Sequence, residues 1–484
     1  MDPLNETRQV EVAVVGAGPA GLSAALAAAR TGAQVLLIDN YRQPGGQYYR
    51  QLATEFKTTQ PARRQQEGSA LWQQVSAAGV ELLAETTVWG AFAGNRLALY
   101  GAGAPAYLQA RAVILATGAY ERAAAFPGWT LPGVMTTGAA QLLLKEQRIL
   151  PGRRIVLAGA GPLQLVVAAG LAQAGAEVIA VLEATPLMRN VLQRPLPYGL
   201  ALWGQWGRLA EGLSSWLALR TAGVPVYTGW GVVAAQGQAE LTGVTIAQLD
   251  RQWRPIPGAA RSLACDTLCC NYGFTPATEL ARLLGAHCEW RPERGGFVPV
   301  RDNYMQSDVP GVFVVGDGAG IGGAGLAGVE GQVAGLAAAA QVKANGSDWR
   351  ASAAVSGGLK RLQPALQREQ RFQRFYGELF TPGPGLDELA EPDTIICRCE
   401  GVSRGQIAET VRQGADTLDA VKALTRCGMG NCQGRVCGPL VTATVAQEAG
   451  RTRAETGQFR VRPPVFPVPL NCVTTYPHPL TPSP

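Results

Sequence analysis

The chain has 484 residues, too many for a single hydrophobic core, which predicts about two to four domains. Its 42 basic and 36 acidic residues give a net charge of only +6, spread along the chain, which argues against a nucleic-acid-binding protein. The 60 glycines stand in clusters, so they indicate positions of special backbone geometry rather than low complexity.

The first predicted unit is a strand, a glycine turn, a helix and a second strand within residues 11–39. In the G-x-G-x-x-G turn, the first glycine makes the bend, the second lets a pyrophosphate approach, and the third lets helix and strand pack closely. The helix points its positive N-terminal end at the phosphates. Asp39 ends the second strand, where a carboxylate binds ribose hydroxyls. The residues predicted to bind a dinucleotide here are Gly16, Gly18, Pro19, Ala20, Gly21, Asp39 and Asn40.

Three later segments bear on which dinucleotide this is. "QPGGQYYRQ" at 43–51 offers Gly45, Gly46 and Gln47, "AVILATGAYER" at 112–122 is a strand that ends in Thr117-Gly118, and 309–335 holds Gly316-Asp317 before a helix. In this order the pieces resemble the two-dinucleotide-binding flavoproteins, which include the pyridine nucleotide–disulfide reductases. The resemblance implies that this first site takes FAD and that Asp317 holds its ribityl or pyrophosphate part. A helix N-cap is the other interpretation of Asp317.

A second glycine turn follows at 153–184, with Gly159, Gly161 and, at the end of its second strand, Glu183. The third glycine position holds Gln164, although glycine there allows close helix–strand packing. In the resembling proteins this domain binds NAD(P)H. The substitution leaves three alternatives open here: an NAD(P)H site, a site for another adenine nucleotide, or a domain kept for architecture.

Residues that commonly carry flavoenzyme chemistry are missing from the expected places. No cysteine pair follows the first glycine turn, and none stands at the start of the second domain. Cys265, Cys269 and Cys270 read as small core residues. His287 and His478 belong to no evident constellation, so no catalytic residue is predicted. A flavin without a dithiol or an acid–base partner indicates electron transfer, or chemistry that takes place elsewhere.

A Pro/Gly break at 381–385 precedes a segment in which five of the ten cysteines fall within residues 397–437. The N-terminus shows no export signal, which predicts a reducing cytoplasm and argues against disulfides. Four thiolates can hold a [2Fe–2S] cluster. C-x-C is tight for a zinc knuckle, although zinc stays an alternative, as does a set of ordinary core cysteines. The segment resembles the small bacterioferritin-associated-ferredoxin-like [2Fe–2S] domain. That resemblance implies the ligands Cys397, Cys399, Cys432 and Cys437 and leaves Cys427 spare, although Cys427 and Cys432 have the same spacing as Cys432 and Cys437.

Stretches along most of the chain resemble one family. "ATGAYERAAAFPGWTLPGVMTTGA", "MQSDVPGVFVVGDGAG" and "CRCEGV…TRCGMGNCQGRVCG" are similar to the α subunit of heteromeric flavin-dependent amine and amino-acid dehydrogenases, of the opine oxidase, proline or hydroxyproline dehydrogenase and hydrogen cyanide synthase type. The resemblance implies an FAD-containing, oxidase-like β subunit that oxidises the C–N bond, an FMN at the subunit interface, a small ferredoxin-like subunit in some members, and a quinone or other acceptor. It also implies a cytoplasmic protein that lies at the inner face of the membrane through its complex. The alternatives are a self-contained NAD(P)H-dependent reductase and a nucleotide-bound scaffold.

The sequence therefore predicts an α/β flavoprotein with tandem Rossmann-like domains and a small, helical, cysteine-rich [2Fe–2S] domain. The expected regions are an FAD-binding domain at 1–125 and 285–345, a second Rossmann-like domain at 126–284, a helical linker at 346–390, the cluster domain at 391–450 and a proline-rich tail at 451–484.

Overall fold

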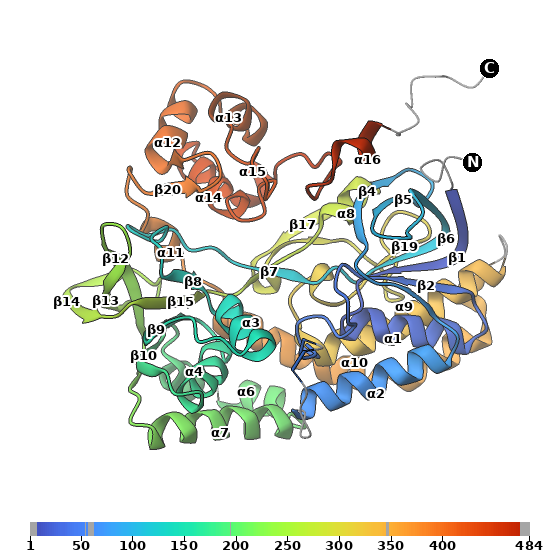
Figure 1. Cartoon of the computed structure of the whole chain (residues 1–484), viewed down its shortest axis with the longest axis horizontal. Coiled ribbons are helices and arrows are strands. Elements are labelled where there is room, and N and C mark those ends of the chain that lie inside the picture. Colours follow the sequence, from blue (N-terminus) through green and yellow to red (C-terminus); the bar gives the residue numbers. More distant parts are fainter. Residues whose placement is uncertain (1–6, 54, 57–61, 194, 345–347, 475–484) are drawn as a thin grey trace.

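A computed structural model gives the structure of the chain over residues 7–53, 55–56, 62–193, 195–344 and 348–474 (Figure 1). Of the regions predicted above, residues 1–6, the start of the linker at 346–347 and the end of the tail from 475 onward, with His478, lie outside the described residues. Within them the predicted combination of two Rossmann-like units and a small helical domain is present.

The first unit is built on a seven-stranded sheet in the order β3-β2-β1-β6-β5-β4, with β19 paired to β6. Its parallel central strands are buried on both faces, as their runs of Val, Leu and Ala require. Helix α9, far along the chain, packs along α1, so a late segment completes the first unit. The elements are β1 (Thr7–Val15), α1 (Pro19–Arg30), β2 (Val35–Ile38), α2 (Arg63–Ala77), β3 (Glu81–Leu83), β4 (Thr87–Phe92), β5 (Arg96–Tyr100), β6 (Tyr107–Leu115), β19 (Val312–Val314), η3 (Gly316–Ala319) and α9 (Gly323–Ala344).

The second unit has a five-stranded sheet in the order β11-β10-β9-β15-β8, covered by helices and joined to a three-stranded antiparallel sheet. Its glycine turn lies at the carboxyl end of β9, as the first lies at the end of β1. Its elements are β8 (Val134–Thr136), α3 (Thr137–Gln147), β9 (Arg154–Gly159), α4 (Leu163–Gln173), β10 (Glu177–Glu183), α5 (Leu187–Gln193), α6 (Pro195–Leu202), α7 (Trp206–Thr221), β11 (Val226–Thr228), β12 (Trp230–Gly237), β13 (Leu241–Leu249), β14 (Pro255–Ala264) and β15 (Thr267–Asn271).

Short elements connect the two units. β7 (Ala119–Glu121) pairs with β16 (Phe274–Pro276), so the chain passes between the units twice at one place. After these come α8 (Glu279–Leu283), the hairpin of β17 (Cys288–Arg291) and β18 (Gly296–Pro299), and η2 (Pro292–Arg294) between its strands.

The expected helical linker is a single long helix, α10 (Ala353–Phe380), preceded by η4 (Trp349–Ala351). It does not stand apart from the two units, because it packs against α9, α6 and η2. Its C-terminal part runs back toward the junction between the units.

The cysteine-rich domain sits at one end of the molecule, above the second unit (Figure 1). Ser403 begins α12 with a capping box, and the Thr417 side chain accepts the Ala420 N–H to begin α13. Trp129 Nε1 donates to Ile395 O (2.6 Å). The cysteine-rich domain and the second unit share one hydrophobic core. Its elements are α11 (Gly385–Glu388), β20 (Ile395–Cys397), β21 (Val402–Ser403), α12 (Arg404–Arg412), α13 (Leu418–Thr425), α14 (Gly438–Glu448) and α15 (Arg453–Thr456). Helix α16 (Leu470–Thr474) lies apart from this domain, near β4 (Figure 1).

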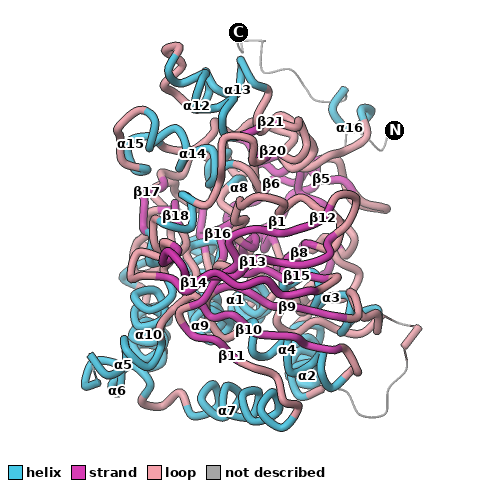
Figure 2. The backbone as a smooth tube through the Cα atoms, turned by 90° about the vertical axis from the view of Figure 1, so that its left-hand side faces the viewer, coloured by secondary structure: helices cyan, strands magenta, loops and turns pink. Residues whose placement is uncertain are grey.

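One face of α6 and α7 turns large apolar side chains outward. Helix α7 lies along an edge of the molecule in both views (Figures 1 and 2). Trp203 and Trp206 are 68% and 64% exposed. Among the described helices, none is long and apolar enough to cross a membrane. The α6–α7 face consists of Leu196, Leu200, Trp203, Trp206, Leu209, Leu213, Trp216 and Leu217.

Candidate cofactor sites

The first glycine turn has the geometry that its pattern predicts. Gly16 has φ +101°, and a methyl group on it would lie 2.4 Å from Ala116 O. A methyl group on Gly21 would lie 1.7 Å from Gly16 O, so helix and strand require glycine there. A methyl group on Gly18 would meet only Gly46 Cα, at 3.9 Å. The turn therefore leaves space over Gly18, where a pyrophosphate approaches in this type of fold. Pro19 and Ala20 form the first turn of α1.

Asp39 is tied to this turn. Its Oδ2 accepts the Ala17 N–H (2.5 Å) and its Oδ1 accepts the Tyr41 N–H (2.8 Å). Burial raises the pKa of the Asp39 carboxyl, against the effect of these two bonds. The carboxylate thus lies beside the turn at the end of β2, and the neighbouring Asn40 is exposed.

The Gly45–Gln47 segment closes against the same turn. The Gly45 N–H donates to Ala17 O (2.8 Å), and a methyl group on Gly46 would lie 2.8 Å from Gly18 Cα. Gln47 Nε2 donates to Tyr41 Oη (3.3 Å). The two glycine segments approach at backbone distance, which explains the need for Gly-Gly here.

Thr117, Gly118, Gly316 and Asp317 lie together beside the first turn. Thr117 Oγ1 donates to Ala277 O (2.7 Å), while a methyl group on Gly118 would meet nothing within 4 Å. A methyl group on Gly318, next to Asp317, would lie 2.8 Å from Thr117 Oγ1. The ATG strand end and the Gly-Asp turn therefore meet in space.

Asp317 also stabilises the start of α9. Its Oδ1 accepts the Gly322 and Gly323 N–H groups, both at 2.9 Å. Burial raises the pKa of this carboxyl. The N-capping interpretation is thus realised through Oδ1, and Oδ2 is the oxygen with which Asp317 could bind a cofactor hydroxyl.

The second glycine turn is also formed, with different surroundings. Glu183 Oε2 accepts the Gly161 N–H (2.9 Å) and Oε1 accepts the Thr185 N–H (2.8 Å). Burial raises the pKa of Glu183 to about 8. Gln164, 1% exposed, donates from Nε2 to Asn271 O (2.9 Å) and lies against Gly159. Gln164 therefore replaces the close glycine contact with a buried hydrogen bond to the end of β15.

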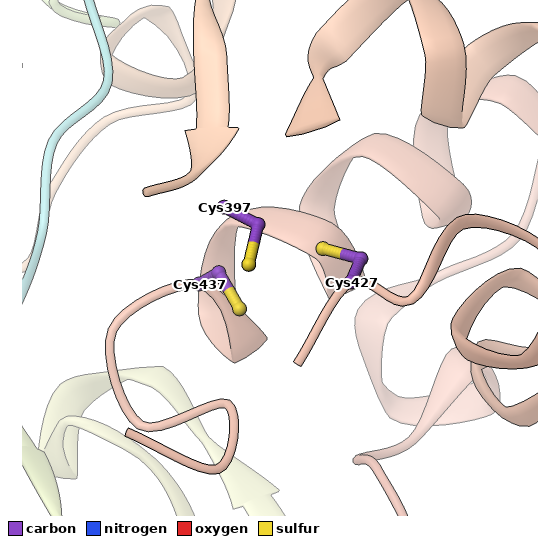
Figure 3. A group of neighbouring side chains, drawn as sticks. All are labelled: Cys397, Cys427 and Cys437. Carbon is purple, nitrogen blue, oxygen red and sulfur yellow. The ribbon is translucent and has the colours of Figure 1, made fainter. Parts of the chain in front are cut away.

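Three cysteine thiols converge in the C-terminal domain (Figure 3). Cys397 ends β20, Cys427 follows α13 and Cys437 precedes α14; their Sγ atoms lie within 4.8 Å of one another and all three residues are buried. Cys432 hydrogen-bonds with Cys437 and with Cys399. The structure thus brings two of the predicted ligands, Cys397 and Cys437, together with Cys427, which the sequence analysis set aside. Cys432 and Cys399 lie outside this group of three and are connected to it through the Cys432–Cys437 hydrogen bond.

Hydrogen bonds within this group favour thiolate forms. The hydrogen bond with Cys437 lowers the pKa of Cys397 to about 5 and that of Cys432 to about 4. The pKa of Cys437 is raised by its side-chain hydrogen bonding with Cys397, Cys427 and Cys432. Backbone N–H groups of Gly428 and Glu400 also lower the pKa of Cys397. Cys397 and Cys432 are therefore favoured as thiolates, the form in which cysteine binds an iron–sulfur cluster.

Three cysteines of the second unit differ from these. Cys265 and Cys269 are buried, Cys270 is half-buried, and burial raises the pKa of each, to about 11 for Cys265 and about 12 for Cys269. These three side chains belong to the second unit and fit small core residues. They lie outside the thiol group that could hold a metal.

A basic cavity lies beside the Cys432–Cys437 loop, between the cysteine-rich domain and the β16–β18 region. Its empty volume is about 1100 Å³, part of it open to solvent. Sequence analysis did not find it, because its residues are dispersed between 120 and 465. Its basic side chains are Arg122, Arg282, Lys422, Arg435, Arg453, Arg460 and Arg462; its carboxylate is Glu279; its aromatic rings are Tyr120, Trp290, Phe297 and Phe459.

Comparison with known families decides the relationship. Residues 10–199 and 209–344 match the pyridine nucleotide-disulphide oxidoreductase model, and residues 395–447 match the BFD-like [2Fe-2S] binding domain. The chain belongs to the pyridine nucleotide-disulphide oxidoreductase family. This membership confirms the predicted fold class, an FAD-type dinucleotide fold and a [2Fe–2S]-type C-terminal domain.

Relatives within this family match nearly the whole chain. The opine oxidase A-type subunit of Agrobacterium tumefaciens (strain Ach5) is 33% identical over 97% of this chain and 92% of its own. The HcnB subunit of hydrogen cyanide synthase from Pseudomonas aeruginosa is 35% identical over 95% of this chain and 97% of its own. The alpha subunit of sarcosine oxidase from Corynebacterium sp. (strain P-1) is 27% identical over 95% of this chain but 44% of its own length.

A solved structure shows the same fold. L-proline dehydrogenase from P. horikoshii superposes with a TM-score of 0.67 at 20% identity, over 97% of this chain and 80% of that one. The relatives are oxidoreductase subunits, which confirms the predicted family resemblance and enzyme class. Together with the two family models, they fit a flavin and iron–sulfur electron-transfer subunit of a heteromeric dehydrogenase.

Proposed function

We propose that this chain carries electrons within a heteromeric dehydrogenase that oxidises an amine or amino acid of the opine, proline or glycine type. The observation that carries the proposal is the union, in one chain, of an open dinucleotide turn and a buried group of thiols. A partner, oxidase-like subunit oxidises the substrate, and this chain passes the electrons to an acceptor such as a quinone. A small ferredoxin-like subunit, and a cytoplasmic complex at the inner face of the membrane, stay predictions of the resemblance.

FAD is the proposed cofactor of the first turn. Gly16, Gly18 and Gly21 shape its pyrophosphate site, while Asp39 and Asp317 offer carboxylate oxygens to its hydroxyls. Bound FAD supplies two-electron acceptance and one-electron release. The residues fit FAD because Gly18 faces open space and because backbone N–H groups hold the Asp39 and Asp317 carboxylates in position.

The proposed cluster ligands are Cys397, Cys399, Cys432 and Cys437. Cys397 and Cys437 are both predicted ligands and members of the group of three thiols. The choice therefore concerns the other two ligands, which are taken from Cys399, Cys427 and Cys432. Cys427 is a fully buried member of the group of three thiols, whereas Cys399 is exposed and lies outside that group. A Cys427→Ala variant should retain iron and visible cluster absorption, and a Cys399→Ala variant should lose both. Iron loss in Cys427→Ala with retention in Cys399→Ala would show that Cys427 is the fourth ligand.

The basic cavity is where we place the interface FMN. Its seven basic side chains against one carboxylate suit a phosphate, and its aromatic rings suit a flat ring system. Arg122 Nε and Thr275 Oγ1 are buried at this cavity without a hydrogen-bond partner among the described residues, which supports a missing polar ligand.

FMN content tests this placement. The purified complex is denatured and its released flavins are separated by chromatography. Arg122→Met should lower the FMN:FAD ratio at least about fivefold, while Arg291→Met, an exposed arginine outside the cavity, should leave it unchanged. An unchanged ratio in Arg122→Met would remove the cavity as the FMN site.

The partner subunit is proposed to dock on the α6–α7 face. Monomeric proteins seldom expose so many large apolar side chains together, and Trp is enriched at protein interfaces. The relatives named as subunits favour a protein partner over other occupants. Trp206→Ser with Leu213→Ser should weaken co-purification of the partner, whereas Tyr100→Ser, an exposed ring on β5, should not. If the Trp206→Ser/Leu213→Ser variant keeps the partner but loses binding to lipid vesicles, the α6–α7 face contacts a membrane instead.

Co-purification with mass spectrometry and a visible spectrum tests the function as a whole. The expected result is a stable complex with an oxidase-like flavoprotein, flavin and iron–sulfur absorption, and bleaching on addition of the partner's amine substrate. The proposal would be refuted by recovery of this chain as a stable, flavin-containing monomer whose flavin is not bleached by amines even when other subunits are present.

A further inference from the structure

The two glycine turns differ at the position that a pyrophosphate needs. Gly18 and Gly161 are the second glycines of their turns, the ones that let backbone and pyrophosphate come together. A methyl group on Gly18 would meet only Gly46 Cα, at 3.9 Å. A methyl group on Gly161 would lie 2.6 Å from Tyr376 Oη. The space that is free in the first unit holds a tyrosine hydroxyl in the second.

Tyr376 belongs to the C-terminal part of α10 and is held there. Its ring packs on Phe380, with centroids 4.9 Å apart. One residue later, Gly377 lies against the backbone of η2, where a methyl group would stand 2.2 Å from Glu293 O. Gln373 Nε2 donates to the same carbonyl (3.2 Å). These contacts hold the part of α10 that carries Tyr376 in place, and the packing on Phe380 orients its ring.

The turn itself satisfies its polar groups internally. The Gly161 N–H, which could bind a phosphate oxygen, donates to Glu183 Oε2 (2.9 Å). Glu183 is 5% exposed, and its other oxygen accepts the Thr185 N–H (2.8 Å). A dinucleotide would have to displace both the hydroxyl of Tyr376 and the hydrogen bond between Gly161 and Glu183.

We infer that Tyr376 closes the second glycine turn to dinucleotides and so excludes NADH and NADPH as electron donors of this chain. Tyr376 is a specificity-determining residue: it acts by occupying the pyrophosphate position. The inference rests on the proposed function, because it explains why electrons enter from a partner subunit. It predicts that the second unit contains a nucleotide-binding turn whose pyrophosphate position is occupied by Tyr376.

Direct nucleotide binding tests this. NADH is titrated by equilibrium dialysis into the FAD-loaded chain, so that the first turn is already filled. The wild-type chain and Tyr376→Phe, whose ring still covers Gly161, should bind NADH only at millimolar concentration. Tyr376→Ala should bind it at least about tenfold more tightly. Adding Gly161→Val to Tyr376→Ala refills the space and should abolish the gain, which locates the new binding at this turn.

The outcomes separate this inference from the proposed function. Micromolar NADH binding by the wild-type chain would overturn the closure, while an intact complex bleached by its amine substrate would leave the proposed function standing. A folded, FAD-retaining Tyr376→Ala that binds no more tightly than wild type would also overturn it. Should Tyr376→Ala fail to fold, Tyr376→Leu keeps apolar packing on Phe380 and should show the same gain.

Discussion

A buried ion pair next to the Gly316–Asp317 turn offers a sharp prediction on stability. Arg301 and Glu330 have side chains that are 10% and 1% exposed, and Arg301 Nη2 lies 2.5 Å from Glu330 Oε1. The other carboxylate oxygen of Glu330 accepts the Gly316 N–H (2.9 Å), and Arg301 Nη1 donates to Val314 O (2.9 Å). The pair therefore fixes the turn that carries Asp317.

Arg301→Met leaves the Glu330 carboxylate buried without its cation. Breaking one partner of a buried pair costs about 3–5 kcal/mol, whereas an exposed pair is worth about 0–1 kcal/mol. The matched control is Arg8→Met, because Arg8 pairs with Glu81 at side-chain exposures of 33% and 48%. At roughly 2–4 °C per kcal/mol for a unit of this size, Arg301→Met should lower the melting temperature by about 6–20 °C.

Differential scanning fluorimetry of the FAD-loaded protein measures this, with released flavin as a second readout. Arg301→Met should melt well below Arg8→Met and release FAD more readily. The double variant Arg301→Met/Glu330→Gln should recover part of the lost melting temperature, because it also removes the unpaired negative charge of Glu330. Equal melting temperatures for Arg301→Met and Arg8→Met would refute the reasoning that burial makes this pair different.

Three further predictions concern the two turns and the thiol group. Burial raises the pKa of Glu183 to about 8, so the unfolded chain loses this proton at lower pH than the folded chain, and stability falls as pH rises from about 4.5 to 8. In urea unfolding, Glu183→Gln should therefore become progressively more stable than wild type over that range. A constant difference in free energy of unfolding between the two proteins would contradict this. Gly18→Ala should lower FAD content at least about tenfold because its methyl group enters the space over the turn, while Gly212→Ala, a glycine of α7 with equally open surroundings, should keep wild-type flavin absorption. Cys437→Ala removes the thiol that hydrogen-bonds with Cys397, Cys427 and Cys432, so this variant should lose its bound iron. The control Cys265→Ala changes a core cysteine and should retain iron. Iron at wild-type levels in Cys437→Ala would exclude this group of thiols as the cluster site.

Features that depend on neighbouring residues were predictable from sequence. The glycine turn and Asp39 lie within one strand–helix–strand unit, so their spacing alone predicts that they meet, and Asp39 does lie on the Ala17 amide. The predicted helical linker and the helices of the cysteine-rich domain follow from local capping and periodicity in the same way. The cysteines were also identified as one group, since five of them fall in a short segment.

Features that depend on contacts between distant residues were decided by the tertiary structure. Cys427 and Cys432 have the same spacing as Cys432 and Cys437, so spacing could not tell which thiols converge; the folding of the loop before α14 brings Cys427 to Cys397 and Cys437. The basic cavity joins residues from several elements, and no local pattern marks it. Tyr376 lies 215 residues beyond Gly161, and only the packing of α10 at the junction of the two units sets its hydroxyl over that turn. The sequence alone thus determined which nucleotide turns and thiols the chain contains, because those patterns are local, while long-range packing decided which turn is open and which is closed.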